Sequence, residues 1–209
     1  MIAGAPDPVA GSHDPPPAGV WNVANALTIV RIALVPVFVW LFFLDGTGWR
    51  LAAFAVFAVA SITDKIDGDI ARARGLVTDF GKIADPIADK ALTGGALVSL
   101  SVMGELWWWV TAAIMVREIG VTVLRFVVIR RGVIPASKGG KLKTMLQVVA
   151  IGLYILPGPL DPLRWVTMGA AVVVTVVTGV DYVVRAWRMW NASDGTEDGW
   201  AAGPRPPRS

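Results

Sequence analysis

Long apolar segments separated by short polar stretches constrain this chain more than any other feature of its sequence. An apolar run of about 18 residues or more can cross the hydrocarbon core of a bilayer as a helix. Hydrophobic residues occupy 55% of the 209 positions, which is high for a soluble domain. We therefore expect six membrane-spanning helices, at residues 27–44, 51–74, 83–103, 107–129, 142–156 and 163–187.

The two ends of the chain differ in composition from this apolar part. Residues 1–20 and 191–209 are rich in Pro, Gly and small or polar residues and show no apolar periodicity. Such segments bury too little surface to offset the entropy that is lost on ordering, so we expect two disordered tails. The predicted fold is all-α, with one polytopic membrane domain over residues 21–190.

Basic residues are distributed unevenly among the connections between the apolar segments. They gather in the second and fourth connections and after the last segment, whereas the other three connections hold few. The positive-inside rule places such basic connections in the cytoplasm. We therefore expect both termini and the second connection on the cytoplasmic side, as an even number of spans requires.

Six aspartates lie within residues 63–90, between two apolar segments. Asp64 and Asp67 are three residues apart at the end of the second expected helix, and Asp85 and Asp89 are four apart at the start of the third. These spacings place each pair on one helix face. A short turn between the two helices would bring the four carboxylates together, where they would repel each other unless positive charge compensates them.

Two interpretations of this cluster are open from the spacing alone. Neighbouring lysines and arginines would neutralise the carboxylates on a solvated face, or divalent cations would lie between them, since ionisable groups inside membrane segments usually have a function. The chain has no cysteine and no histidine nearby, so oxygen ligands would favour Mg²⁺ or Mn²⁺. The small residues Gly68, Ala71 and Gly81 would leave room for a ligand or for close helix packing.

The pattern D-x2-D-G-x2-A-R-x8-G-x3-D-x3-D runs from Asp64 to Asp89 and resembles the signature of the CDP-alcohol phosphatidyltransferase family at every fixed position. The resemblance implies a six-helix membrane enzyme, in the plasma membrane of a bacterium, that displaces CMP from a CDP-linked lipid by an alcohol. It also implies a homodimer, and it gives Asp89 the further role of accepting the proton of the alcohol. Two divalent ions would be bound by Asp64, Asp67, Asp85 and Asp89.

The same resemblance implies where the donor CDP-diacylglycerol binds. Arg72 would pair with the diphosphate, and Gly81 would leave space for the nucleotide. Asn25 and Thr28 match an Asn-x2-Thr element of the family, although an Asn-capped helix start would explain them equally well. The full set of residues implied for the donor is Asn25, Thr28, Gly68, Ala71, Arg72, Thr78 and Gly81.

A second segment, residues 117–147, carries charges inside an apolar stretch. We expect Glu118 to neutralise an arginine within the bundle, and the remaining basic groups suit an anionic acceptor because cations bind phosphate. The segment resembles phosphatidylglycerophosphate synthases, a group within the family, through its Arg-Glu pair, Arg125, the Gly-Lys-Leu-Lys-Thr run and Gln147. The resemblance implies glycerol 3-phosphate as the acceptor. Its phosphate would contact Arg117, Arg125, Lys141 and Lys143.

Other functions fit parts of the sequence less well. A cation transporter would also use intramembrane carboxylates, but transport sites usually lie near the bilayer midplane. A phosphate-binding P-loop would need Ser or Thr where Leu142 stands. Inositol phosphate and phosphatidylglycerol remain alternative acceptors within the family. Arg31, near the start of the first apolar segment, would bind an anionic lipid or substrate, or extend to the lipid headgroups.

Overall fold

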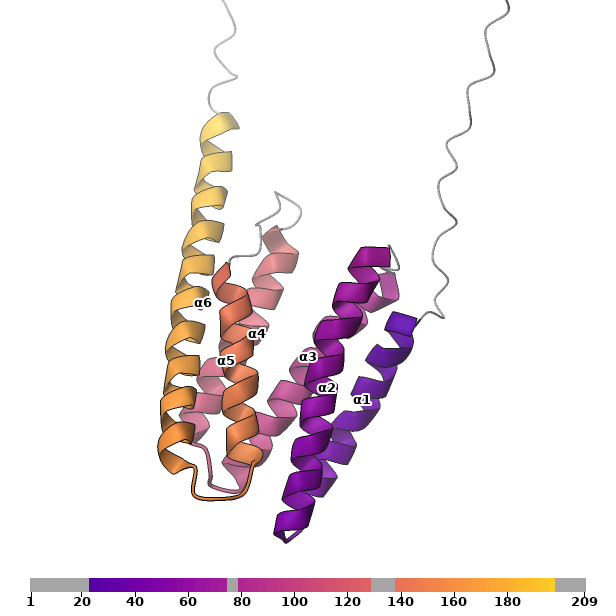
Figure 1. Ribbon diagram of the computed structural model, residues 1–209. Helices are drawn as coiled ribbons and strands as arrows, with labels where there is room; N and C mark the ends of the chain where they lie inside the picture. Colours follow the sequence, from indigo (N-terminus) through magenta and orange to yellow (C-terminus); the bar gives the residue numbers. More distant parts are fainter. Residues whose placement is uncertain (1–22, 75–78, 129–137, 198–209) are drawn as a thin grey trace, which may run out of the picture.

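A computed structural model describes residues 23–74, 79–128 and 138–197, with side chains for residues 25–64, 81, 84–124 and 142–188. Within these ranges the chain forms α-helices and no strand (Figure 1). The helices are α1 (Val23–Phe42), α2 (Thr47–Arg74), α3 (Asp79–Val102), α4 (Trp108–Val128), α5 (Lys138–Ile155) and α6 (Asp161–Glu197).

Each apolar segment of the sequence corresponds to one of these six helices, which confirms the all-α prediction for the described part of the chain. The largest difference is at the end of α6, which continues to Glu197 and therefore enters the residues that we assigned to the C-terminal tail. Loss of the apolar pattern does not end a helix that is already formed, because each added residue contributes a backbone hydrogen bond. Residues 1–22 and 198–209, which make up most of the expected tails, lie outside the description.

Successive helices run antiparallel, so the start of α1 and the end of α6 lie at the same end of the bundle (Figure 1). The connections α1–α2, α3–α4 and α5–α6 lie at the opposite end, and each contains a glycine with positive φ. At Gly104, where φ is 73°, the following amide of Glu105 donates to the carbonyl of Leu100 at 3.0 Å and so caps α3. A residue with a Cβ would be strained in this conformation.

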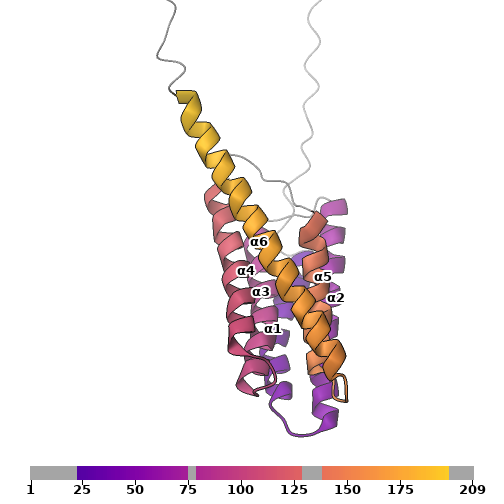
Figure 2. The same ribbon diagram turned by 90° about the vertical axis from the view of Figure 1, so that its left-hand side faces the viewer.

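The helices pack as two groups that meet along the middle of the molecule. α1 has its main contacts with α2 and α3, whereas α6 crosses the face formed by α4 and α5 (Figure 2). The core between them contains Phe38 and Phe42 of α1 and Phe57 of α2, with the ring centroids of Phe38 and Phe57 5.9 Å apart. Ile114 of α4 and Ile151 of α5 are also fully buried there. Between the polar ends, the two groups are therefore joined by an apolar core.

The outer surface of the bundle is apolar as well. Large hydrophobic side chains such as Val116, Val166 and Val173 are mostly exposed. Among the described residues, two segments are long and apolar enough to cross a membrane by length and composition, Asn25–Phe42 and Asp161–Arg188, and Leu142–Ile155 is a shorter apolar helix. The six-span arrangement and its orientation remain predictions.

Candidate functional site

Helix α1 holds one aspartate of α2 and one of α3 against a single face. Thr28 donates a hydrogen bond from its hydroxyl to Oδ1 of Asp85 at 2.5 Å, and Nη1 of Arg31 forms an ion pair with Oδ1 of Asp64. Thr28 and Arg31 are buried and lie three residues apart, so their side chains are neighbours on α1. The carboxylates of Asp64 and Asp85, distant in sequence, are therefore brought to the same region.

These two carboxylates fit the donor chemistry of a hard divalent cation. Both are accessible, since the side chain of Asp64 is 37% exposed and Asp85 is exposed. Asp67 lies on α2 three residues after Asp64, but its side chain is outside the description. Among the described side chains no group of three or more His, Cys, Asp or Glu residues is close enough to hold a metal ion. Of the four predicted ligands, Asp64 and Asp85 are thus held by neighbouring residues of α1.

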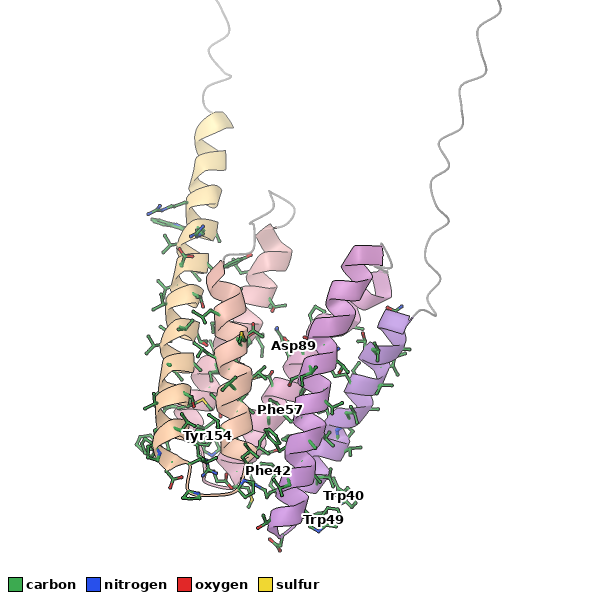
Figure 3. The ribbon with its side chains drawn as sticks, in the orientation of Figure 1. Trp40, Phe42, Trp49, Phe57, Asp89 and Tyr154 are labelled. Carbon is green, nitrogen blue, oxygen red and sulfur yellow. The ribbon has the colours of Figure 1, made fainter. Side chains whose placement is uncertain are left out.

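Asp89 lies one helical turn after Asp85 on α3, in the half of the bundle away from Trp40 and Trp49 (Figure 3). Its side chain is 42% exposed, and its Oδ2 lies 3.5 Å from Nζ of Lys90. This accessibility leaves the carboxylate able to meet a substrate, while the ammonium of Lys90 supplies adjacent positive charge.

Glu118 of α4 is surrounded by cations from three helices. It forms an ion pair with Lys143 of α5, its Oε2 lies 3.6 Å from Nζ of Lys90, and its Oε1 lies 3.3 Å from Nη1 of Arg117. The expectation that Glu118 neutralises an arginine inside the bundle is confirmed. However, the closest contact is with Lys143. With Asp89 beside Lys90, the cluster holds three cations and two carboxylates, so it keeps one positive charge.

A small cavity of about 20 Å³ lies among α3, α4 and α5 and joins Asp89 to this basic cluster. A cavity of this size has room for about one water molecule or one hydroxyl group. Its wall combines charged and polar groups with the apolar side chains of Met115 and Val148. The polar residues in the wall are Asp89, Lys90, Thr93, Glu118, Lys143, Thr144 and Gln147.

Arg117 extends toward α6 and does not line this cavity. Its Nη2 donates to the hydroxyl of Thr178 at 3.1 Å. Gly179 provides the space, since a Cβ at that position would lie 2.9 Å from Cγ of Arg117. Arg117 therefore contacts the basic cluster through Glu118, from the side of α6.

A second hollow, of about 270 Å³, lies between α2 and α5. Its wall is almost entirely apolar and includes Phe57 and Ala58 of α2 and Gly152 of α5. Ser61 and Ile62 also line it, so it reaches to within two residues of Asp64 along α2. An apolar groove thus lies between α2 and α5 and ends near the part of α2 that carries Asp64.

The remaining predicted site residues are described only in part. Asn25 and Gly81 are buried on α1 and α3. Asp67, Gly68, Ala71 and Arg72 belong to α2, Arg125 to α4 and Lys141 to α5, but their side chains are outside the description, and Thr78 lies outside it altogether.

Arg31 and Lys90 have contacts in the site that the sequence analysis did not predict. The interpretation that Arg31 extends to the headgroups is wrong, because its side chain is 1% exposed and paired with Asp64. The sequence feature that indicates a role for Arg31 in the site is its position, three residues after Thr28 on the same helix face. Lys90 directly follows Asp89, and only the packing of α3 against α4 shows that it also approaches Glu118.

Comparison with known proteins gives one consistent result. The profile of the CDP-alcohol phosphatidyltransferase family matches residues 21–177. A "Probable phosphatidylglycerophosphate synthase" of Mycobacterium tuberculosis H37Rv is 56% identical over 176 residues, which cover 82% of this chain and 84% of the relative. The "CDP-diacylglycerol–glycerol-3-phosphate 3-phosphatidyltransferase" of Bacillus subtilis is 36% identical over 194 residues, or 84% and 100% of the two chains. A Rickettsia typhi protein with the same description is 38% identical over 77% of this chain and 94% of its own.

Proposed function

Because the chain belongs to the CDP-alcohol phosphatidyltransferase family, we propose that it transfers the phosphatidyl group of CDP-diacylglycerol to glycerol 3-phosphate. The products are phosphatidylglycerophosphate and CMP, so the protein is a transferase of phospholipid biosynthesis. The structural observation that carries this proposal is the cavity in which Asp89 lies beside Lys90 and Lys143. It joins a carboxylate that can accept a proton to cations that can hold a phosphate.

In the proposed reaction, a hydroxyl oxygen of glycerol 3-phosphate attacks the phosphorus nearest the diacylglycerol. The new phosphorus–oxygen bond replaces the bond to CMP, which leaves as the free nucleotide, and the hydroxyl proton moves to the carboxylate of Asp89. A neutral alcohol is a poor nucleophile, so a positioned base typically contributes about a hundredfold or more to the rate. The exposure of Asp89 and its place in the cavity wall support this role.

Asp64, Asp67, Asp85 and Asp89 would hold Mg²⁺ or Mn²⁺ ions, which supply charge stabilisation at the diphosphate oxygens when they are bound. The chain's own residues set up that site. Thr28 holds one oxygen of Asp85 and Arg31 holds one oxygen of Asp64, which fixes the directions of both carboxylates. Residues that orient metal ligands in this way commonly affect metal affinity and activity by roughly ten- to a hundredfold.

For the acceptor, the excess positive charge around Glu118 supports binding of an anion. Lys90, Arg117 and Lys143 all contact this one carboxylate, so an incoming phosphate dianion would share their charge with it. Charge-assisted hydrogen bonds of this kind are stronger than those between neutral groups. We assign the phosphate to the two lysines of the cavity, Lys90 at its more exposed side and Lys143 in its wall, with Arg125 and Lys141 as further contacts and Arg117 acting through Glu118.

For the donor, the apolar groove between α2 and α5 suits one acyl chain. It is lined by Phe54, Ala58, Val149 and Leu153 and approaches Asp64 at one end. A diphosphate bound at the carboxylates, by Arg72 and with Gly68, Ala71 and Thr78 beside it, would leave the attached diacylglycerol next to this groove. Asn25, Thr28 and Gly81 complete the part of the site proposed for the CDP group.

We place the protein in the plasma membrane of a bacterium as a homodimer, with the site at the cytoplasmic end. The mostly exposed valines of the outer surface would face lipid. Trp40 and Trp49 lie near helix ends away from Asp89 (Figure 3), and the exposed run Trp107 to Trp109 lies at the start of α4, at the same end of the bundle as the α1–α2 connection. Indoles at this end would meet the outer interface of the bilayer. The basic residues of the sequence favour the same orientation.

The test is release of CMP by the purified protein from CDP-diacylglycerol with a panel of acceptors. We expect release with glycerol 3-phosphate, reversible loss on chelation, and little release with inositol phosphate or phosphatidylglycerol. Preference for another acceptor would contradict the proposed substrate, and ion flux into vesicles without CMP release would favour a transporter instead.

A further inference from the structure

Gln147 of α5 has a buried carbonyl oxygen that no hydrogen bond satisfies within the described part of the chain. The residue is 4% exposed, and its Oε1 has neither a solvent contact nor a described partner. Buried polar side-chain atoms in proteins nearly always have a partner, because an unpaired one costs free energy. A partner from outside the chain would remove that cost.

The position of Gln147 shows where such a partner would lie. Gln147 lines the same cavity as Asp89 and Lys143. It follows Lys143 by four residues on α5, so the amide and the ammonium lie on one helix face, one turn apart. Asp89, the proposed proton acceptor, and Lys143, a proposed phosphate ligand, therefore line the same cavity as this amide.

The size of the cavity limits what the partner can be. A volume of about 20 Å³ admits a group of the size of a hydroxyl. It does not admit a phosphate together with a carbon chain, so the rest of an acceptor would extend toward the more exposed side chains of Asp89 and Lys90. A hydroxyl group can donate a hydrogen bond to Oε1, whereas a fully ionised phosphate cannot.

We propose that Gln147 accepts a hydrogen bond from the hydroxyl of the acceptor that does not react, while the lysines of the cavity bind its phosphate. This inference rests on the proposed function. In glycerol 3-phosphate the group is the hydroxyl on the middle carbon, between the phosphate-bearing carbon and the attacking hydroxyl. Gln147 is then a specificity-determining residue that selects a polyol phosphate over a simple hydroxyalkyl phosphate and over phosphate alone.

The direct test compares two acceptors in the full-length protein, glycerol 3-phosphate and 3-hydroxypropyl phosphate, which lacks the middle hydroxyl. The wild type should favour glycerol 3-phosphate in kcat/KM by roughly three- to tenfold, the value of one hydrogen bond between neutral groups. Gln147→Met, which keeps a long side chain without an amide, should lose this preference. Its inhibition by inorganic phosphate and its KM for CDP-diacylglycerol should stay unchanged.

Thr175→Val is the matched control. Oγ1 of Thr175 on α6 is also buried without a described partner, but Thr175 does not line the cavity. This variant should keep the wild-type preference between the two acceptors. Gln147→Leu provides a second test of the same contact if Gln147→Met folds poorly.

Retention of the full preference in Gln147→Met would overturn the proposal. Equal weakening of both acceptors and of phosphate would also overturn it, because it would mean that Gln147 only shapes the cavity or holds a water molecule there. If the wild type uses another polyol phosphate and not glycerol 3-phosphate, the proposed function fails. Gln147→Met should then weaken that acceptor relative to its own deoxy analogue, and no such weakening would overturn the inference separately.

Discussion

Arg31 on α1 and Asp64 on α2 form an ion pair in which the guanidinium is 1% exposed and the carboxylate 37%. The chain therefore supplies a buried positive charge to the region where two aspartates converge. Thr28, one turn earlier, holds the second of these aspartates, Asp85. We infer that α1 both orients the carboxylates and offsets part of their repulsion.

Removing this buried charge should affect stability more without metal than with it. In chelator, Arg31→Met leaves the aspartates without their protein counterion and should cost about 1–3 kcal/mol of unfolding free energy. With Mg²⁺ bound, the ions compensate the carboxylates and the loss should shrink. Thermal unfolding in detergent, with and without Mg²⁺, measures both values.

The control for this variant is Arg185→Met, since Arg185 pairs with Asp181 on the exposed surface of α6 at 2.9 Å. Exposed pairs contribute about 0–1 kcal/mol. We expect a small effect that does not depend on Mg²⁺. An equal loss for Arg31→Met in chelator and in Mg²⁺ would contradict the counterion role.

The hydrogen bond from Thr28 to Asp85 should lower the Mg²⁺ concentration that the reaction needs. Thr28→Val keeps the shape of the buried side chain but removes the donor, so Asp85 is no longer held. We expect the Mg²⁺ concentration for half-maximal CMP release to rise roughly tenfold or more. Thr28→Ser restores the hydroxyl and should recover most of the wild-type value. Similar curves for Thr28→Val and Thr28→Ser would exclude this role.

Replacing Lys143 should weaken binding of the acceptor and leave binding of the donor unchanged. Lys143→Ala removes a charge-assisted hydrogen bond worth about 1.5–3 kcal/mol, which corresponds to roughly a ten- to hundredfold rise in KM for glycerol 3-phosphate. The KM for CDP-diacylglycerol should barely change. Steady-state kinetics with each substrate varied in turn measure this difference. If the donor KM rises and the acceptor KM does not, the two halves of the site are assigned the wrong way round.

Filling the apolar groove should weaken binding of long-chain donors only. Ala58→Phe places a ring between α2 and α5, where we expect an acyl chain. The effect should be only a few-fold, since the chain leaves a lipid environment that is already apolar. Comparison of dioleoyl and dihexanoyl donors tests it, with Val173→Phe on the exposed face of α6 as the control. A similar rise in KM for both donors would mean that the ring disturbs the helices instead.

The helices were predictable because each apolar segment forms one, and the two aspartate pairs lie on α2 and α3 as expected. The partners of these residues were not predictable. Arg31 meets Asp64, and Lys143 meets Glu118, only because of how the helices pack against one another. Nor does sequence spacing show that Gly179 opens space for Arg117 on α6. Contacts between helices depend on rotation about each helix axis, which an apolar pattern around most of the helix leaves undetermined.

The central claim is that glycerol 3-phosphate itself becomes part of the lipid product. The direct measurement supplies isotopically labelled glycerol 3-phosphate and CDP-diacylglycerol to the purified protein with Mg²⁺, and quantifies labelled lipid and CMP together. We predict equimolar amounts, with the lipid having the mass of phosphatidylglycerophosphate and with neither product formed by Asp85→Asn. CMP release without labelled lipid, or the absence of both products in the wild type, would contradict the account.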